Sequence, residues 1–152
     1  MENEKKLLIR PMSFSDIDAI DEIAHLVFPD PWPKDSYQRE LDNELAHFFV
    51  MTYSEVVIGF CHFWITFDSV SIVQFAIHPL LQGKKLGSLL MAHFLDRITK
   101  LEEVKAITLE VRTQNEPAIA LYLNNGFQII NTKKKFYTNG DDAYYMVKVI
   151  RE

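Results

Sequence analysis

The segment from residue 72 to residue 90 constrains the fold most, because a strand pattern passes into a helix pattern through a short polar turn. The apolar run Ile72–Ile77 is typical of a buried strand and stops before Pro79. The turn 82–88 carries two glycines and two lysines, and a helical apolar pattern begins at Leu86. Unpaired N–H groups and the dipole at a helix start attract anions. The segment therefore predicts either a phosphate-binding turn or an ordinary connection with solvated lysines. It lacks the spacing of a P-loop and of a dinucleotide fingerprint.

The length and composition indicate one globular domain, residues 1–152. A chain of 152 residues that is 48% apolar can bury a sizeable core, which argues against disorder. The apolar run Leu7–Ile9 is too short for a signal peptide, and Val56–Phe67 is shorter than the ~18 residues of a membrane span. We therefore expect no membrane partner.

The single cysteine and the net charge limit the cellular compartment and the classes of partner that we expect. Cys61 stands alone, so an internal disulfide is excluded, which fits the reducing cytoplasm. Its aromatic neighbours favour a buried thiol over a nucleophile. A net charge of −5 argues against direct binding of nucleic acid. The histidines form no metal-like cluster, since His62 and His78 are isolated, so we expect no metal site.

Hydrophobic periodicity predicts an α+β fold with a mixed sheet. The expected strands are 7–11, 48–53, 56–67, 70–77, 104–111, 127–131 and 143–150. The expected helices are 17–27, 34–43, 86–100 and the segment between Asn115 and Gly126. The dipeptides Ser54-Glu55 and Asp68-Ser69 predict hairpins between the central strands.

Local signals define several boundaries. Ser15 and Asp18 have the spacing of a capping box before the first helix. Alternating prolines make 28–33 a stiff loop that carries Trp32. Asn115 is expected to cap the fourth helix, and Lys133–Lys135 to form a basic loop.

Alternation along 104–111 separates an apolar face from a polar one. Thr108, Glu110 and Arg112 share the polar face. Glu110 is thus either a general base or a solvated carboxylate paired with Arg112. The residue pattern leaves both readings open.

Four separated segments together resemble the GNAT superfamily of acetyl-CoA-dependent N-acetyltransferases. They are Gln82-x-x-Lys85-x-Gly87, Leu109–Arg112, Asn115–Phe127 and the end pieces Phe136-Tyr137 and Asp142-Ala143. The resemblance covers nearly the whole chain and is greatest to the RimI type, the ribosomal-protein alanine N-acetyltransferases. It implies a mixed, mostly antiparallel central sheet flanked by helices.

The resemblance implies acetyl-CoA as cosubstrate and no metal. The pantetheine arm would pair with the strand that leads into the turn. The implied acetyl-CoA-binding residues are Phe75, Ala76, Ile77, Gln82, Gly83, Lys84, Lys85, Leu86, Gly87, Ser88, Asn115 and Tyr122. Lys85 departs from the family turn, which has glycine there. A positive φ would strain Lys85, whereas an ordinary φ would leave its N–H free for phosphate.

The resemblance also implies the chemistry. Glu110 is the expected general base and Tyr122 the expected general acid, with a core tyrosine as the alternative for Tyr122. Trp32, Glu110 and Tyr137 are the expected contacts to the acceptor. Near pH 7 roughly a tenth of a protein α-amine is neutral, against about one lysine in two thousand, so a weak base suffices for an N-terminus.

The leading function is acetylation of a protein N-terminal α-amine, which the resemblance narrows to the alanine of a small-subunit ribosomal protein. One alternative is a small-amine acetyltransferase that acts on a polyamine or a drug. Another is a non-catalytic acetyl-CoA-binding module. The sequence does not define the oligomeric state.

Overall fold

A seven-stranded sheet forms the centre of the computed structural model, which describes residues 6–152. The strand order is β1-β2-β3-β4-β5-β7-β6, and every neighbouring pair is antiparallel except β4 and β5. The strands are β1 (Leu7–Pro11), β2 (Ala46–Tyr53), β3 (Val56–Thr66), β4 (Ser69–Ile77), β5 (Ala106–Arg112), β6 (Gln128–Lys133) and β7 (Ala143–Val149). This mixed, mostly antiparallel sheet confirms the predicted fold class.

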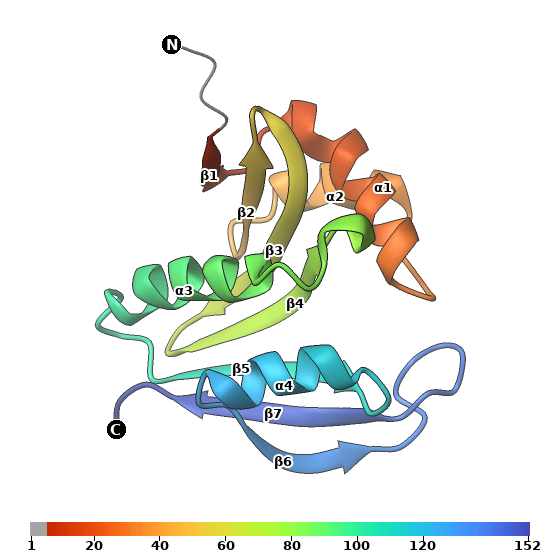
Figure 1. Ribbon diagram of the computed structural model, residues 1–152. Helices are drawn as coiled ribbons and strands as arrows, with labels where there is room; N and C mark the ends of the chain where they lie inside the picture. The colour runs from red at the N-terminus through yellow and green to blue at the C-terminus, as the bar shows by residue number, and fades with distance from the viewer. Residues whose placement is uncertain (1–5) are drawn as a thin grey trace.

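Helices cover both faces of the sheet (Figure 1). They are α1 (Ile17–Val27), α2 (Lys34–Leu41), α3 (Leu86–Thr99) and α4 (Glu116–Asn124), with short 3-10 turns η1 (Phe14–Asp16) and η2 (Pro79–Leu81). Successive strand residues point to opposite faces, so Val50 packs in the cluster with α1 and α2 while Met51 packs in the cluster with α3. Cys61 is fully buried, as predicted. Within residues 6–152, every helix is too short or too polar to span a bilayer.

The central strands follow one another through tight hairpins, as predicted, but the second loop is Phe67-Asp68 because Ser69 already pairs with Thr66. Ser54 and Glu55 have φ of 48° and 73°, the backbone twist that a two-residue hairpin loop requires. Asn115 caps α4 by accepting from the Ala118 N–H at 3.3 Å. Gly126 follows α4 with φ of 92°, which favours glycine there.

Two local predictions were wrong. The capping box lies at Ser13 and Asp16, because η1 precedes α1: the Ser13 N–H donates to Asp16 Oδ2 at 2.8 Å. Ser15 and Asp18 therefore do not form it. Lys133 is not in a loop but ends β6, where it pairs with Ala143.

Candidate active site

The site begins where β4 and β5 separate. Ser69–Ile72 of β4 pair in parallel with Ala106–Leu109 of β5. Beyond these residues the two strands diverge and form a V (Figure 1). At the closed end Ser71 Oγ lies 3.2 Å from Thr108 Oγ1. A pocket of about 460 Å³ fills the opening. Among the described residues, no strand pairs with 73–77 of β4 on the β5 side, so backbone hydrogen-bonding groups on that edge are available to a ligand.

The turn 82–88 follows β4 after the short η2 and is tied back to the strand. Gln82 Nε2 donates to the Ile77 carbonyl at 3.1 Å. A Cβ placed on Gly87 would lie 3.6 Å from Leu121 Cδ2 and 4.0 Å from Phe75 Cε1, so the start of α3 packs beside both β4 and α4. The turn residues do not themselves line the pocket.

Lys85 has the left-handed backbone that the sequence left open. Its φ is 66° and its ψ is 17°, so the position does require the conformation that glycine adopts without cost. The Lys85 carbonyl accepts the Leu89 N–H at 3.3 Å, at the start of α3. Both Lys84 and Lys85 are exposed, which leaves their ammonium groups available to an anion.

Glu110 lies on the pocket side of β5, as the alternation predicts. Ile107, Leu109 and Val111 are buried in the core on the other face. The Glu110 carboxylate accepts from Lys133 Nζ at 2.7 Å, and its side chain is 28% exposed. The predicted alternative partner, Arg112, does not pair with it. Glu110 is therefore accessible from the pocket but balanced by one cation on β6.

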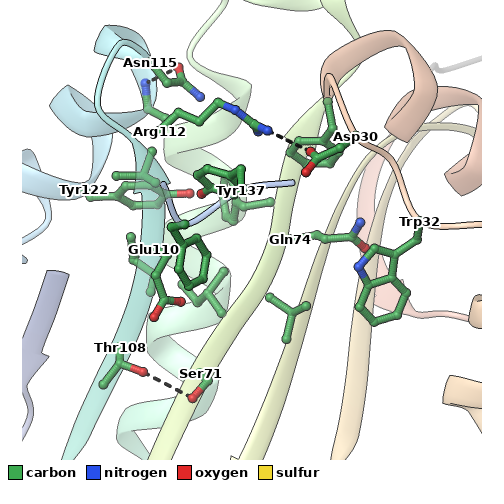
Figure 2. Close-up of a pocket in the computed structure, with 18 of the residues that line it drawn as sticks. Asp30, Trp32, Ser71, Gln74, Thr108, Glu110, Arg112, Asn115, Tyr122 and Tyr137 are labelled. Carbon is green, nitrogen blue, oxygen red and sulfur yellow. Dashed lines mark hydrogen bonds and ion pairs between the residues drawn. The ribbon is translucent and has the colours of Figure 1, made fainter. Parts of the chain in front are cut away.

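Tyr122 reaches the same pocket from α4. Its ring packs edge-on between Phe75 at 6.2 Å and Phe127 at 5.7 Å, and Figure 2 shows its hydroxyl turned toward the pocket. Burial raises the pKa of this phenol above its ordinary value. The group therefore stays protonated at neutral pH and can donate a proton or a hydrogen bond. It is a core residue and a pocket residue at once.

Arg112 joins two loops above the pocket. Its Nη2 donates to Asp30 at 2.9 Å, and its Nε donates to Asp141 at 2.9 Å (Figure 2 shows the first of these bonds). Its guanidinium also lies 3.8 Å from the centre of the Tyr137 ring. Burial, opposed chiefly by the Arg112 charge, raises the pKa of Tyr137 to about 12.

A buried polar network supports the opposite wall. Gln74 Oε1 lies 3.3 Å from the Tyr37 hydroxyl and 3.2 Å from His62 Nδ1. His62 Nε2 in turn contacts Glu40, which also accepts from Trp64 Nε1 at 2.8 Å. Burial lowers the pKa of His62 despite this carboxylate. The network fixes the Gln74 and Trp64 side chains that line the pocket.

The pocket unites six of the fifteen predicted site residues. Of these, its lining includes Trp32, Phe75, Glu110, Asn115, Tyr122 and Tyr137. The sequence analysis missed the further lining residues Asp30, Gln74 and Phe136, and proposed Arg112 only as a partner of Glu110. Gln74 and Arg112 lie on β4 and β5, the two strands that line the pocket, so the strand pattern could have indicated them. Asp30 lies in a loop, where no pattern in the sequence indicates it. Residues 6–152 contain no cluster of acidic, histidine or cysteine side chains suited to a metal ion.

Comparison with known proteins assigns the chain to a family. The model of the acetyltransferase (GNAT) family matches residues 17–127. The chain belongs to this family. The matched segment contains β4, the turn 82–88, Glu110 and Tyr122.

Individual relatives extend the match to the whole chain. A putative [ribosomal protein bS18]-alanine N-acetyltransferase of Bacillus subtilis is 37% identical, with 97% of this chain and 98% of that protein covered. The crystal structure of the ribosomal-protein-S18-alanine N-acetyltransferase from Escherichia coli superposes with a TM-score of 0.87 at 27% identity, covering 97% of this chain and 96% of that one. Thus the GNAT fold extends beyond the segment matched by the family model.

A third relative shows how far the fold alone can be used. The spermidine/spermine N-acetyltransferase SpeG from Vibrio cholerae has a TM-score of 0.78 at 23% identity, with 95% of this chain and 93% of that one covered. Acetyltransferases named for different acceptors therefore share this architecture. The identity of the acceptor must be argued from the residues of the pocket.

Proposed function

We propose that this protein transfers the acetyl group of acetyl-CoA to the N-terminal α-amine of a protein, with the alanine N-terminus of ribosomal protein bS18 as its acceptor. The observation that carries the proposal is the open V between β4 and β5, with Glu110 and Tyr122 lining one pocket. Relatives of full length named for this reaction support the choice of acceptor. We propose that the enzyme acts in the cytoplasm, where it would meet a ribosomal acceptor.

The free edge of β4 suits the pantetheine arm of acetyl-CoA. This arm is a chain of amides, which can pair with a strand edge as an additional strand does. The edge at 73–77 leads through η2 to the turn 82–88, where α3 begins. Backbone N–H groups of that turn, the α3 dipole and the exposed Lys84 and Lys85 would hold the pyrophosphate. Asn115 would offer its amide to the arm.

Glu110 would act on the acceptor amine. The amine must lose a proton before its lone pair can attack the thioester carbonyl, and a carboxylate can take that proton directly or through one water. Lys133 Nζ donates to Glu110 Oε2 at 2.7 Å and so holds the carboxylate in place beside the pocket. A weak base is adequate because an α-amine has a pKa of only about 8.

Tyr122 would act on the leaving group. Attack by the amine nitrogen forms the new C–N bond, and collapse of the intermediate breaks the C–S bond. The electron pair leaves on sulfur, and the protonated phenol of Tyr122 can supply the proton that converts the thiolate to the CoA thiol. Burial keeps that phenol protonated, which is the state a general acid needs.

The walls of the pocket suit the end of a peptide. Trp32 and Tyr137 offer aromatic surface, and Asp30 adds a second carboxylate to that of Glu110. These carboxylates favour a cationic amine on approach, while Arg112 and Lys133 offset them and so disfavour a polycation. A single α-ammonium followed by neutral backbone fits this balance better than spermidine does.

The test compares acceptors with the purified protein and acetyl-CoA. Mass spectrometry should find one acetyl group on the α-amine of a synthetic peptide that carries the bS18 N-terminus beginning with alanine. The matched control is an otherwise identical peptide whose N-terminus is blocked. It should not react even if it contains lysine. Faster acetylation of spermidine would assign the small-amine alternative. No transfer to any amine, with acetyl-CoA still bound, would indicate a non-catalytic module.

A further inference from the structure

Arg112 is a charged residue whose side chain is almost completely buried. It is the last residue of β5, and its side chain is only 10% exposed although it carries a charge. A buried guanidinium persists when its donors are paired, and here two different carboxylates take them. Asp30 belongs to the α1–α2 loop (28–33), and Asp141 belongs to the β6–β7 loop (134–142).

The two loops are far apart in sequence, and Arg112 contacts both of them. Thr138 Oγ1 of the β6–β7 loop donates to Asp30 Oδ2 of the α1–α2 loop at 3.2 Å, beside the Arg112 bond to the same carboxylate. The guanidinium face lies on the Tyr137 ring at 3.8 Å. One side chain thus touches both loops through three separate groups.

Both loops form the wall of the pocket that we assign to the acceptor. The α1–α2 loop contributes Asp30 and Trp32, and the β6–β7 loop contributes Phe136 and Tyr137. Asp141 itself does not line the pocket. Displacement of either loop would therefore move the aromatic walls without touching Glu110, Tyr122 or the free edge of β4.

We propose that Arg112 is a positioning residue that clamps the α1–α2 and β6–β7 loops into one acceptor groove. This inference rests on the proposed function, because it assigns to that function the residue that shapes its acceptor side. The planar guanidinium can hold two carboxylates at once and stack on an aromatic ring, whereas a lysine ammonium cannot reproduce this geometry. The acceptor then binds to preformed walls and does not have to order them.

The clamp predicts that loss of Arg112 raises KM for the peptide much more than KM for acetyl-CoA. In Arg112→Gln the loops would spend most of their time apart, and binding to a minor conformation raises the apparent dissociation constant by the inverse of its population. If about a tenth of the molecules keep both loops in place, KM for the peptide rises about tenfold. KM for acetyl-CoA should change less than about twofold. Arg112→Lys should not restore the peptide KM.

Two further variants separate the clamp from general stability. Asp141→Asn weakens the clamp from outside the pocket and should raise the peptide KM in the same direction, with acetyl-CoA KM unchanged. The matched control is Arg10→Gln, because Arg10 holds Asp16 with two bonds of 2.7 and 2.9 Å on β1, away from the pocket. It should lower the melting temperature and leave both KM values intact.

Hydrogen exchange gives a readout that needs no substrate. The Tyr137 N–H donates to the Asp141 carbonyl at 3.1 Å and the Gly140 N–H to the Tyr137 carbonyl at 2.8 Å, so both amides are protected while the loop is closed. Exchange in 134–142 should quicken in Arg112→Gln and Asp141→Asn, and stay unchanged in Arg10→Gln. Equal rises in both KM values, or unaltered exchange and peptide KM in a folded Arg112→Gln, would overturn the inference. Absence of transfer by the unmodified protein would instead overturn the proposed function.

Discussion

Lys85 offers a test in which two adjacent, identical side chains should respond in opposite directions. It holds a left-handed backbone with φ of 66°, where a residue with a Cβ is strained by roughly 1–2 kcal/mol. Lys85→Gly removes that strain. The glycine adds freedom to the unfolded chain, which costs about 0.4–1 kcal/mol. Taking the middle of each range, the net gain is about 0.8 kcal/mol in the free energy of unfolding.

Lys84 is the matched control. It is exposed like Lys85, but its φ is not positive, so Lys84→Gly has no strain to relieve. Only the entropic cost remains, and the free energy of unfolding should fall by about 0.4–1 kcal/mol. Lys85→Ala keeps the Cβ and should gain nothing.

Thermal unfolding measures both effects. For a chain of this length 1 kcal/mol shifts the melting temperature by about 2–4 °C. Lys85→Gly should therefore melt about 1–4 °C higher than the unmodified protein, and Lys84→Gly about 1–4 °C lower. A loss of stability in Lys85→Gly equal to that in Lys84→Gly would refute the argument from strain.

The same variant tests the charge. If the Lys85 ammonium contacts the pyrophosphate, the affinity of Lys85→Gly for acetyl-CoA should drop by a factor that shrinks as salt is added, because exposed charges are screened. Acetyl-CoA should itself raise the melting temperature, since it binds the native state. No such rise at millimolar acetyl-CoA would contradict the assignment of the turn.

The remaining predictions concern the pocket and its support. Tyr122→Phe should keep the fold and the affinity for acetyl-CoA while transfer slows by about 10²–10⁴-fold in a single-turnover assay; an unchanged rate would return Tyr122 to a packing role. Glu110→Gln should slow transfer near pH 7 and recover part of the rate as pH passes the α-amine pKa of about 8, and a loss independent of pH would count against its role as base. The pKa of His62 is lowered by burial, so the unfolded chain binds more protons below about pH 6.5 and the free energy of unfolding should decrease as pH falls from 7 to 5.5. His62→Gln should reduce that slope in calorimetry, whereas an unaltered slope would show that His62 does not carry it.

Local rules predicted the elements because each depends on neighbours in sequence. Pro79 ends the strand, Asn115 caps α4 and Gly126 ends it through its positive φ, as expected. The capping box was misplaced by two residues because Ser13 and Ser15 both offer an acceptable N-cap three residues before an aspartate. Arg10 on β1 favours the Ser13 box, because it binds the Asp16 carboxylate that this box uses.

Sequence alone therefore determined the order of strands and helices, the turn at 82–88 and the placement of Glu110 on a polar face. Tertiary structure decided which charges meet. Glu110 pairs with Lys133, 23 residues away, because only β7 lies between β5 and β6 in the sheet. Arg112 pairs with Asp30, 82 residues away, because the α1–α2 loop lies beside the end of β5 in the folded chain. The pocket likewise depends on where the β4–β5 ladder stops, at Ile72 and Leu109. No periodicity encodes these contacts, since they join segments whose proximity exists only after the sheet has formed.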